Sequence, residues 1–82
     1  MTYIEIDFNK VKGFKKLTQE QQELFRNTYI RHNSGYGYEH KEDYIPVSVK
    51  WVVDKKDNQY SYLKVVFKNG EWLHYTQRGD WY

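Results

Sequence analysis

Residues 60–77 read YSYLKVVFKNGEWLHYTQ, and they contain the strongest hairpin signal in the sequence. Apolar and polar side chains alternate on both sides of Asn69-Gly70, and a period of two is typical of a half-buried strand. Asn-Gly favours a two-residue type I′ turn, because both central positions of that turn need a positive φ angle. The stretch therefore predicts a β-hairpin with strands over 60–68 and 71–77.

A two-residue turn also predicts the register of the hairpin, with Phe67 opposite Trp72 and Val65 opposite His74. In that register we expect one face of the hairpin to form the core, with the side chains of Leu63, Val65, Phe67, Trp72 and His74. The other face is then a mixed surface of Tyr62, Lys64, Val66, Lys68, Glu71, Leu73 and Tyr75.

The segments before the hairpin predict two further strands. Residues 45–53 alternate, with Val47, Val49, Trp51 and Val53 on one side, and the polar run 54–59 predicts a turn between this strand and the hairpin. Residues 3–8 also alternate and predict a first strand. Residues 9–17, interrupted by Gly13, predict a loop or a single helical turn.

A helix is expected from about Gln19 to about His32. Thr18 is a favourable N-cap, and Gln21 three residues later completes the pattern of a capping box. At 100° per residue the inner face is thin, and it consists of Leu17, Gln21, Leu24, Phe25, Thr28 and His32. Residues 33–37, which begin with Asn33 and contain two glycines, predict that left-handed conformations end the helix.

The predicted order is β-α-β-β-β, with one helix packed on one face of a small antiparallel sheet and a C-terminal three-stranded meander, an α+β fold. Eighty-two residues suffice for one core, so we expect a single domain over 1–82. No stretch approaches the roughly 20 apolar residues of a membrane span, and the acids of residues 1–8 are untypical of a signal peptide. We expect a cytoplasmic protein, in the producing or a host cell.

Composition adds two observations. Nine tyrosines, three tryptophans and four phenylalanines are more rings than a small core can hide, so some should lie at the surface, where Tyr and Trp favour recognition. Thirteen basic residues against eleven acids give a net charge of +2, which is weak evidence for a polyanionic partner. The absence of alanine suggests AT-rich coding, as in a low-GC bacterium, its phages or its mobile elements.

Catalytic and metal-binding motifs are weak in this sequence. His32, Glu39, His40 and Asp43 are potential ligands, but the two histidines lie eight residues apart, without the close spacing of zinc-binding pairs. There is no cysteine, no serine in a G-x-S-x-G elbow and no complete phosphate-binding glycine motif. We predict no catalytic residue, no metal and no cofactor.

Cleavage of RNA by general acid–base chemistry is one alternative. The C-terminal run HYTQRGDWY supplies His74, Tyr75, Arg78 and Tyr82, which are suitable residue types for that reaction. In length and in its C-terminal strands the chain is similar to small bacterial RNase toxins of the RelE-like kind. The resemblance implies a phosphate grip made of basic residues, and Arg78 is the single arginine among the last fifty residues.

Nucleic-acid binding without catalysis is a second alternative. Bases stack on aromatic side chains exposed on a sheet face, and lysines beside those rings neutralise phosphates. Tyr62 and Tyr75, flanked by Lys50, Lys64 and Lys68, form such a platform in the predicted register. The same tyrosines could instead be there simply because tyrosine is a good strand former.

Protein recognition is the reading that we favour from sequence. Residues 31–44 present Tyr36, Tyr38 and Tyr44 in a loop with glycine, serine and asparagine, which is the composition of adaptable binding loops, and Trp81 and Tyr82 add two rings. Alternatively, Tyr36 or Tyr38 closes the open end of the core. We expect a non-enzymatic interaction module that binds a protein partner, for example a phage- or mobile-element-encoded inhibitor or regulator. Pairing of an exposed edge strand could also make a homodimer.

Overall fold

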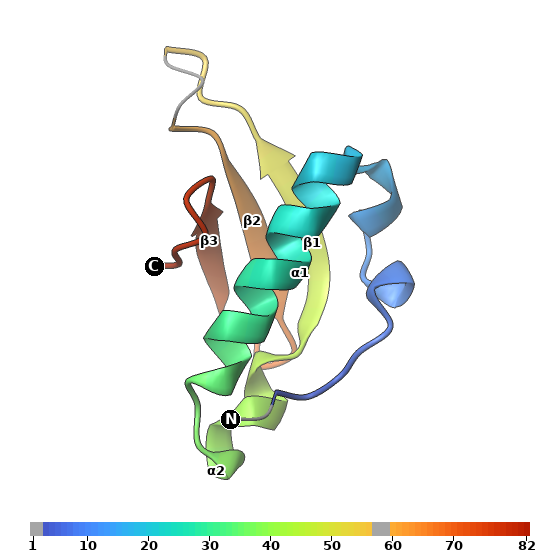
Figure 1. Ribbon diagram of the computed structural model, residues 1–82, viewed down its shortest axis with the longest axis vertical. Coiled ribbons are helices and arrows are strands. Elements are labelled where there is room, and N and C mark those ends of the chain that lie inside the picture. Colours follow the sequence, from blue (N-terminus) through green and yellow to red (C-terminus); the bar gives the residue numbers. More distant parts are fainter. Residues whose placement is uncertain (1–2, 57–59) are drawn as a thin grey trace.

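One long helix crosses one face of a three-stranded antiparallel sheet in the computed structural model, which describes residues 3–56 and 60–82 apart from the side chain of Tyr38 (Figure 1). The main elements are helix α1 (Gln19–Ser34) and strands β1 (Pro46–Val52), β2 (Tyr62–Phe67) and β3 (Trp72–Thr76), in the spatial order β1-β2-β3. Short helical turns complete the fold: η1 (Phe8–Lys10), η2 (Phe14–Lys16), α2 (Tyr38–Lys41) and η3 (Glu42–Tyr44). The predicted α+β class, with one helix on the sheet and a C-terminal meander, is confirmed.

Helix α1 begins where the sequence predicts. The Gln21 backbone N–H donates to Thr18 Oγ1 at 3.2 Å, and the Thr18 N–H donates to Gln21 Oε1 at 3.0 Å. This capping box satisfies two of the N–H groups near the start of the helix. The helix buries one stripe, which consists of Phe25, Thr28, Tyr29, His32 and Asn33. Gln21 and Leu24 of the predicted stripe are only half-buried.

The end of α1 differs from the prediction, because neither Gly35 (φ −79°) nor Gly37 (φ −72°) is left-handed. Asn33 belongs to the helix, and its buried carboxamide accepts from the Ile4 N–H at 2.9 Å and donates to the Lys41 carbonyl at 3.1 Å. Lys41 Nζ in turn donates to the Asn33 carbonyl at 3.0 Å. A cationic donor on a C-terminal carbonyl favours the helix dipole, so tertiary hydrogen bonds support this end.

The loop inside the Phe67–Glu71 backbone pair of the hairpin has three residues, so the predicted two-residue type I′ turn is wrong. Gly70 is left-handed with φ 88°, Asn69 has no positive φ, and the Gly70 N–H donates to the Phe67 carbonyl at 2.9 Å. The Phe67 N–H donates to the Glu71 carbonyl at 2.8 Å and closes the hairpin there. This geometry is the three-residue hairpin loop in which a glycine bulge follows a type I turn.

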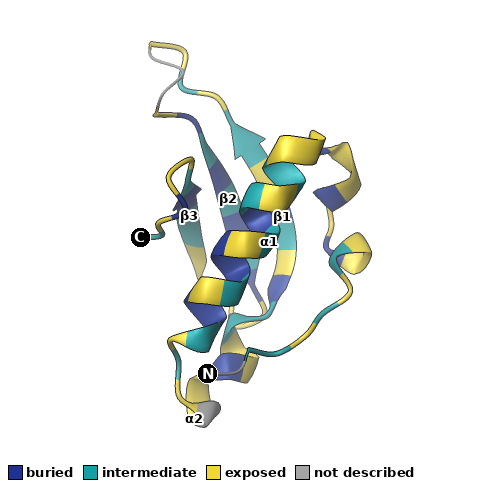
Figure 2. Cartoon of the chain, viewed as in Figure 1, coloured by how far each residue is buried: buried dark blue, intermediate teal, exposed yellow. Residues whose placement is uncertain are grey.

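The additional turn residue shifts the register by one position and reverses the faces of β3. Lys64 lies opposite His74, and Val66 lies opposite Trp72. Since side chains alternate across a strand, Trp72 and His74, predicted for the core, lie on the outer face, and Trp72 is 45% exposed. The inner face buries Leu63, Val65, Phe67 and Tyr75, and half-buries Leu73. Figure 2 shows the resulting alternation of buried and half-buried residues along β2.

The strand predicted over residues 3–8 is not formed. Residues 3–7 have no regular secondary structure, and η1 follows them. The segment is tied to α1: the Ile4 N–H donates to Asn33 Oδ1 at 2.9 Å, and the Tyr29 hydroxyl donates to the Ile4 carbonyl at 2.7 Å. The alternation correctly indicates half-burial of Ile4, Ile6 and Phe8. However, it does not reveal whether the backbone pairs with a strand or with side chains of a helix.

Strand β1 pairs with the N-terminal segment at one point. Lys12 and Ser48 form a parallel bridge. The Lys12 N–H donates to the Val47 carbonyl at 3.1 Å, and the Val49 N–H donates to the Lys12 carbonyl at 2.8 Å. A register irregularity between Pro46 and Ser48 accompanies a Val47 side chain that is 46% exposed, although the alternation places Val47 on the same side as the buried Val49. Of the polar turn predicted over 54–59, residues 57–59 lie outside the described residues.

The C-terminal residues pair with β3 at the edge of the sheet. The Thr76 N–H donates to the Asp80 carbonyl at 2.8 Å, and left-handed Gly79 (φ 85°) donates to the Thr76 carbonyl at 3.0 Å, which repeats the geometry of the first turn. His74 and Tyr82 then exchange two backbone hydrogen bonds, at 2.9 and 3.1 Å. The tail borders one edge of the sheet, and the segment before α1 borders the other (Figure 1).

Gly13 is the position where the fold should tolerate a side chain least. Its φ is 91°, and a Cβ there would lie 2.2 Å from the Val49 carbonyl oxygen. We expect Gly13→Ala to lower the free energy of unfolding by more than about 2 kcal/mol, since left-handed strain adds to a backbone clash. Urea unfolding measures this loss.

Gly37→Ala is the matched control, because Gly37 has φ −72° and no atom lies within 4 Å of its added Cβ. The expected change is less than about 1 kcal/mol. Equal losses in the two variants would contradict the packing of residue 13 against β1.

Candidate functional site

The outer face of the sheet, away from α1, carries three rows of side chains across the strands. The central row runs Lys50, Lys64, His74 and Tyr82, as the strand register and the His74–Tyr82 backbone pair place them. The rows on either side consist of Ser48, Val66 and Trp72, and of Val52, Tyr62 and Thr76. We call these ten residues the outer face.

Four rings of the outer face form one cluster around His74. The His74 ring stacks on Tyr82, with centroids 4.4 Å apart and planes 7° apart, and it lies 4.3 Å from Tyr62 and 4.8 Å from Trp72. Lys64 Nζ lies 4.8 Å from the centroid of Trp72, within the range of a cation–π contact. Trp72 and Tyr82 remain 45% and 68% exposed, so the cluster offers ring surface to a partner.

The charge of the outer face is positive. Lys50 and Lys64 lie directly opposite each other, an arrangement that destabilises a sheet because like charges repel. None of the ten outer-face residues is acidic. Glu71, expected on this face, lies opposite Phe67 instead, and its carboxylate accepts a hydrogen bond from the Tyr44 hydroxyl. An anionic partner would therefore relieve the repulsion between the two lysines.

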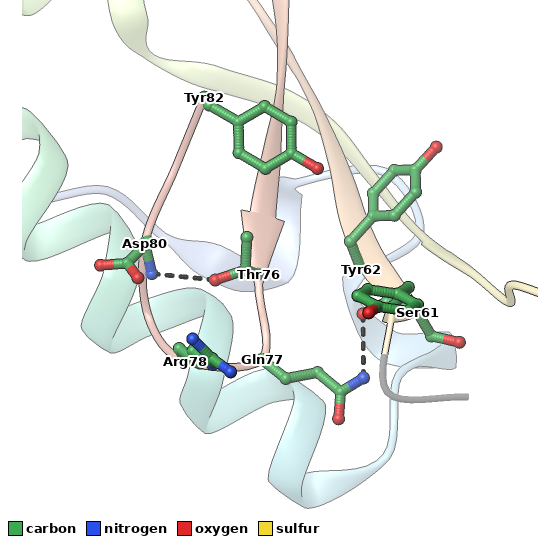
Figure 3. Close-up of a pocket in the computed structure, with 8 residues that line it drawn as sticks. Ser61, Tyr62, Thr76, Gln77, Arg78, Asp80 and Tyr82 are labelled. Carbon is green, nitrogen blue, oxygen red and sulfur yellow. Dashed lines mark hydrogen bonds between the residues drawn. The ribbon is translucent and has the colours of Figure 1, made fainter. Parts of the chain in front are cut away.

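A pocket of about 620 Å³ adjoins the cluster where β2 begins and β3 ends. The rings of Tyr62 and Tyr82 stand on the same side of the strands at its border (Figure 3). Below them, Gln77 Nε2 donates to the Ser61 carbonyl at 3.0 Å, and the Asp80 N–H donates to Thr76 Oγ1 at 3.2 Å. Tyr60, Arg78 and Asp80 also line the pocket, so it continues the outer face with one cation and one carboxylate.

Tyr75 does not belong to the platform predicted for it, because it is fully buried in the core. Its hydroxyl lies 2.8 Å from His32 Nδ1, and the Tyr36 hydroxyl lies 2.9 Å from His32 Nε2. The Tyr36 ring stacks on Tyr44 at 4.4 Å, and the Trp81 ring lies 5.0 Å from the His32 ring. Tyr36, Tyr44 and Trp81 therefore close the core around His32, while Tyr82 lies with Tyr62 and Lys64 on the outer face.

For Tyr36 the contacts favour the alternative in which the ring closes the core, while the side chain of Tyr38 lies outside the described residues. Burial raises the pKa of the Tyr36 hydroxyl, and the hydrogen bond to Glu71 raises the pKa of Tyr44 to about 12. Both hydroxyls are thus neutral at neutral pH. Lys50, flanking the predicted platform, is on the outer face, and Lys68 is an exposed residue of the β2–β3 turn.

His32 is a structural histidine, 1% exposed, with a tyrosine hydroxyl on each ring nitrogen. A neutral imidazole has one N–H and one lone pair, so it donates to one hydroxyl and accepts from the other. Glu39, His40 and Asp43 are exposed, and in the part of the chain that the structure describes no three potential ligands converge on a metal position.

Trp72 and His74 are the site residues that sequence reasoning assigned to the wrong face. With either turn, one side of β3 carries two residues that a core can bury. These are Trp72 and His74 with a two-residue turn, and Leu73 and Tyr75 with a three-residue turn. Hydrophobicity alone therefore did not choose between the registers. A signal for the observed turn is a second run of the same pattern. Residues 76–80 (TQRGD) and 67–71 (FKNGE) both have glycine at the fourth position and an acid at the fifth.

No known protein family, curated protein or solved structure matches this chain. Among the described helices none is both long and apolar enough to cross a membrane.

Burial makes the stability of the protein depend on pH through His32. Desolvation lowers the pKa of His32 from 6.5 to about 4, so on acidification the unfolded chain binds this proton first. The contribution is fully present above pH 6.5 and is lost as the pH falls from 6.5 towards 4. We expect a loss of roughly 1.4 kcal/mol per pH unit from this one group, measured by urea unfolding between pH 7 and 5.

His40→Gln, a change of an exposed histidine, should retain this slope of the unfolding free energy against pH. His32→Gln should reduce the slope by the contribution of one proton, roughly 1.4 kcal/mol per pH unit. If His32→Gln does not fold, NMR titration of the wild-type ring gives the same information. A His32 ring that titrates near pH 6.5 in the folded protein would refute its burial in the neutral form.

Proposed function

We propose that this protein is a non-enzymatic binding module and that its outer face binds single-stranded nucleic acid. The observation that carries the proposal is the aromatic cluster of Tyr62, Trp72, His74 and Tyr82 beside two lysines on a sheet face without an acidic side chain. Single strands are held by base stacking on aromatic rings together with cations along the backbone, and both elements are present here.

The size of the cluster fits a short, sequence-tolerant contact. Each stacked base contributes roughly 1–3 kcal/mol, and the exposed rings of Trp72 and Tyr82 offer surface for such stacking. Lys50 and Lys64 would each neutralise a phosphate, so these two contacts contribute about −1.4 to the slope when the logarithm of the association constant is plotted against that of salt concentration. Duplex DNA should bind less well, because its bases are not free to stack on the cluster.

A protein partner is the second candidate, and one observation favours it. In the free protein Tyr82 already stacks on His74, and Lys64 covers Trp72, so the rings form a preassembled aromatic patch of the kind found at the centre of protein interfaces. The net charge of only +2 is compatible with this reading. Such a partner should have an acidic surface. In this second candidate the protein itself is a phage- or mobile-element-encoded inhibitor or regulator that acts in the host cytoplasm.

Catalysis receives less support. Of the four residues that suggested RNA cleavage, Tyr75 is buried on His32, and its pKa is raised by that burial. His74, Arg78 and Tyr82 remain at the surface, but the His74 ring is stacked on Tyr82 and packed against Tyr62. We therefore assign them binding roles and no catalytic step.

Trp72→Ala should weaken binding of a fluorescent single-stranded 12-mer by roughly five- to 100-fold, since one stacking contact is lost. Trp72→Phe keeps a ring and should retain much of the affinity. Lys64→Gln should flatten the salt slope by about 0.7, whereas Lys15→Gln, at an exposed lysine of η2, should leave it unchanged. Fluorescence anisotropy at several salt concentrations measures all four.

Two results would count against nucleic acid. One is equal binding of single-stranded and duplex DNA that is insensitive to Trp72→Ala. The other is the absence of oligonucleotide binding at low salt, which would favour the protein candidate.

A further inference from the structure

A second pocket, of about 560 Å³, opens at the β1 edge of the sheet, on the side opposite the C-terminal tail. Three of its lining residues are lysines, namely Lys12, Lys16 and Lys50. The others are Gly13, Leu17, Ser48, Val49 and Trp51, so among the residues that the structure describes no carboxylate lines it. Lys50 belongs to the central row of the outer face as well, and it joins this pocket to the row that leads to the aromatic cluster.

The fold fixes the positions of these lysines through the backbone. Lys12 is bound to β1 by the two hydrogen bonds of its bridge, at 3.1 and 2.8 Å. Gly13 then turns the chain with φ 91° against the Val49 carbonyl, and the Lys16 N–H donates to the Gly13 carbonyl at 3.1 Å. Gln22 Nε2 donates to the Phe14 carbonyl at 3.2 Å and ties the same turn to α1. The three lysine backbones are therefore held around one opening before any ligand binds.

The chemistry of this pocket suits a phosphate group. Lysine binds phosphate as a point charge, and the non-bridging oxygens of a backbone phosphate can accept from more than one ammonium group at once. The Ser48 hydroxyl adds a neutral donor to the lining. Without an anion the three ammonium groups would repel one another.

We infer that the β1-edge pocket is a phosphate subsite, which holds a backbone phosphate of the strand whose bases contact the aromatic cluster. This inference rests on the proposed function as regards the source of the phosphate. The subsite makes the two ends of the outer face different. The aromatic cluster lies towards β3 and the tail, and Lys50 and the pocket lysines lie at β1. The sugar–phosphate backbone should then lie over β1, with the bases directed towards β3.

The test uses two probes on the full chain, and it compares lysines that line the pocket with exposed neighbours that do not. Lys12→Gln and Lys16→Gln remove a pocket charge, and Lys10→Gln and Lys15→Gln are controls of equal charge. Inorganic pyrophosphate, followed by NMR, should shift the amides of Gly13, Lys16 and Lys50. Each pocket substitution should weaken its binding roughly fivefold relative to the controls.

The second probe is the single-stranded 12-mer. Lys12→Gln and Lys16→Gln should weaken its binding to a similar extent for every base composition and reduce the salt slope, whereas the controls should not. If pocket and control variants behave alike with both probes, the phosphate subsite is wrong. If pyrophosphate binds as expected but no oligonucleotide binds, the subsite stands and the proposed function fails. If the 12-mer depends on Trp72 but not on Lys12 or Lys16, only the subsite fails.

Discussion

The left-handed conformation of Gly70 is the constraint on which both faces of the sheet depend. With φ at 88° it permits a three-residue turn, and the Phe67–Glu71 backbone bond then sets the register of β3. Because neighbouring side chains on a strand point in opposite directions, that one register assigns Tyr75 to the core and His74 to the surface together. The core and the outer face therefore cannot change independently.

Inside the core, this register brings Tyr75 to the buried imidazole of His32 among aromatic rings. Tyr75 reaches His32 from the sheet, and Tyr36 reaches it from the segment after α1, so both ring nitrogens are satisfied where an unpaired one would cost about 1–3 kcal/mol. Tyr44 extends the arrangement, because its ring stacks on Tyr36 and its hydroxyl binds Glu71 beside the turn. The same contacts that close the core thus remove Glu71 from the outer face.

Local rules in the sequence predicted the elements that depend on local contacts. The capping box at Thr18 and the alternation of residues 60–77 place α1 and the hairpin correctly, because each pattern is satisfied by near neighbours. One failure is local, because Asn69-Gly70 predicted a turn that is one residue too short. The other failures concern partners distant in the sequence. Residues 3–8 alternate like a strand, but the Ile4 backbone bonds to Asn33 and Tyr29 of α1. Asparagine often ends helices, but Asn33 continues α1 because its carboxamide bonds to the Ile4 N–H and to the Lys41 carbonyl.

The register gives the outer face a different local charge from the one that the sequence alone predicted. With a two-residue turn, the outer face would include Glu71, Leu73 and Tyr75, and an acid would stand beside the lysines. The observed turn replaces them with Trp72 and His74 and leaves Lys50 opposite Lys64 without a compensating acid. The acids Glu20, Glu23, Glu39, Glu42 and Asp43 lie in helical elements instead. A net charge of +2 is therefore an average over two unlike surfaces, and at close range a partner meets the local charge. Electrostatic screening over about 8–10 Å at physiological salt strengthens this conclusion, since it weakens the influence of distant acids on a ligand bound at the sheet.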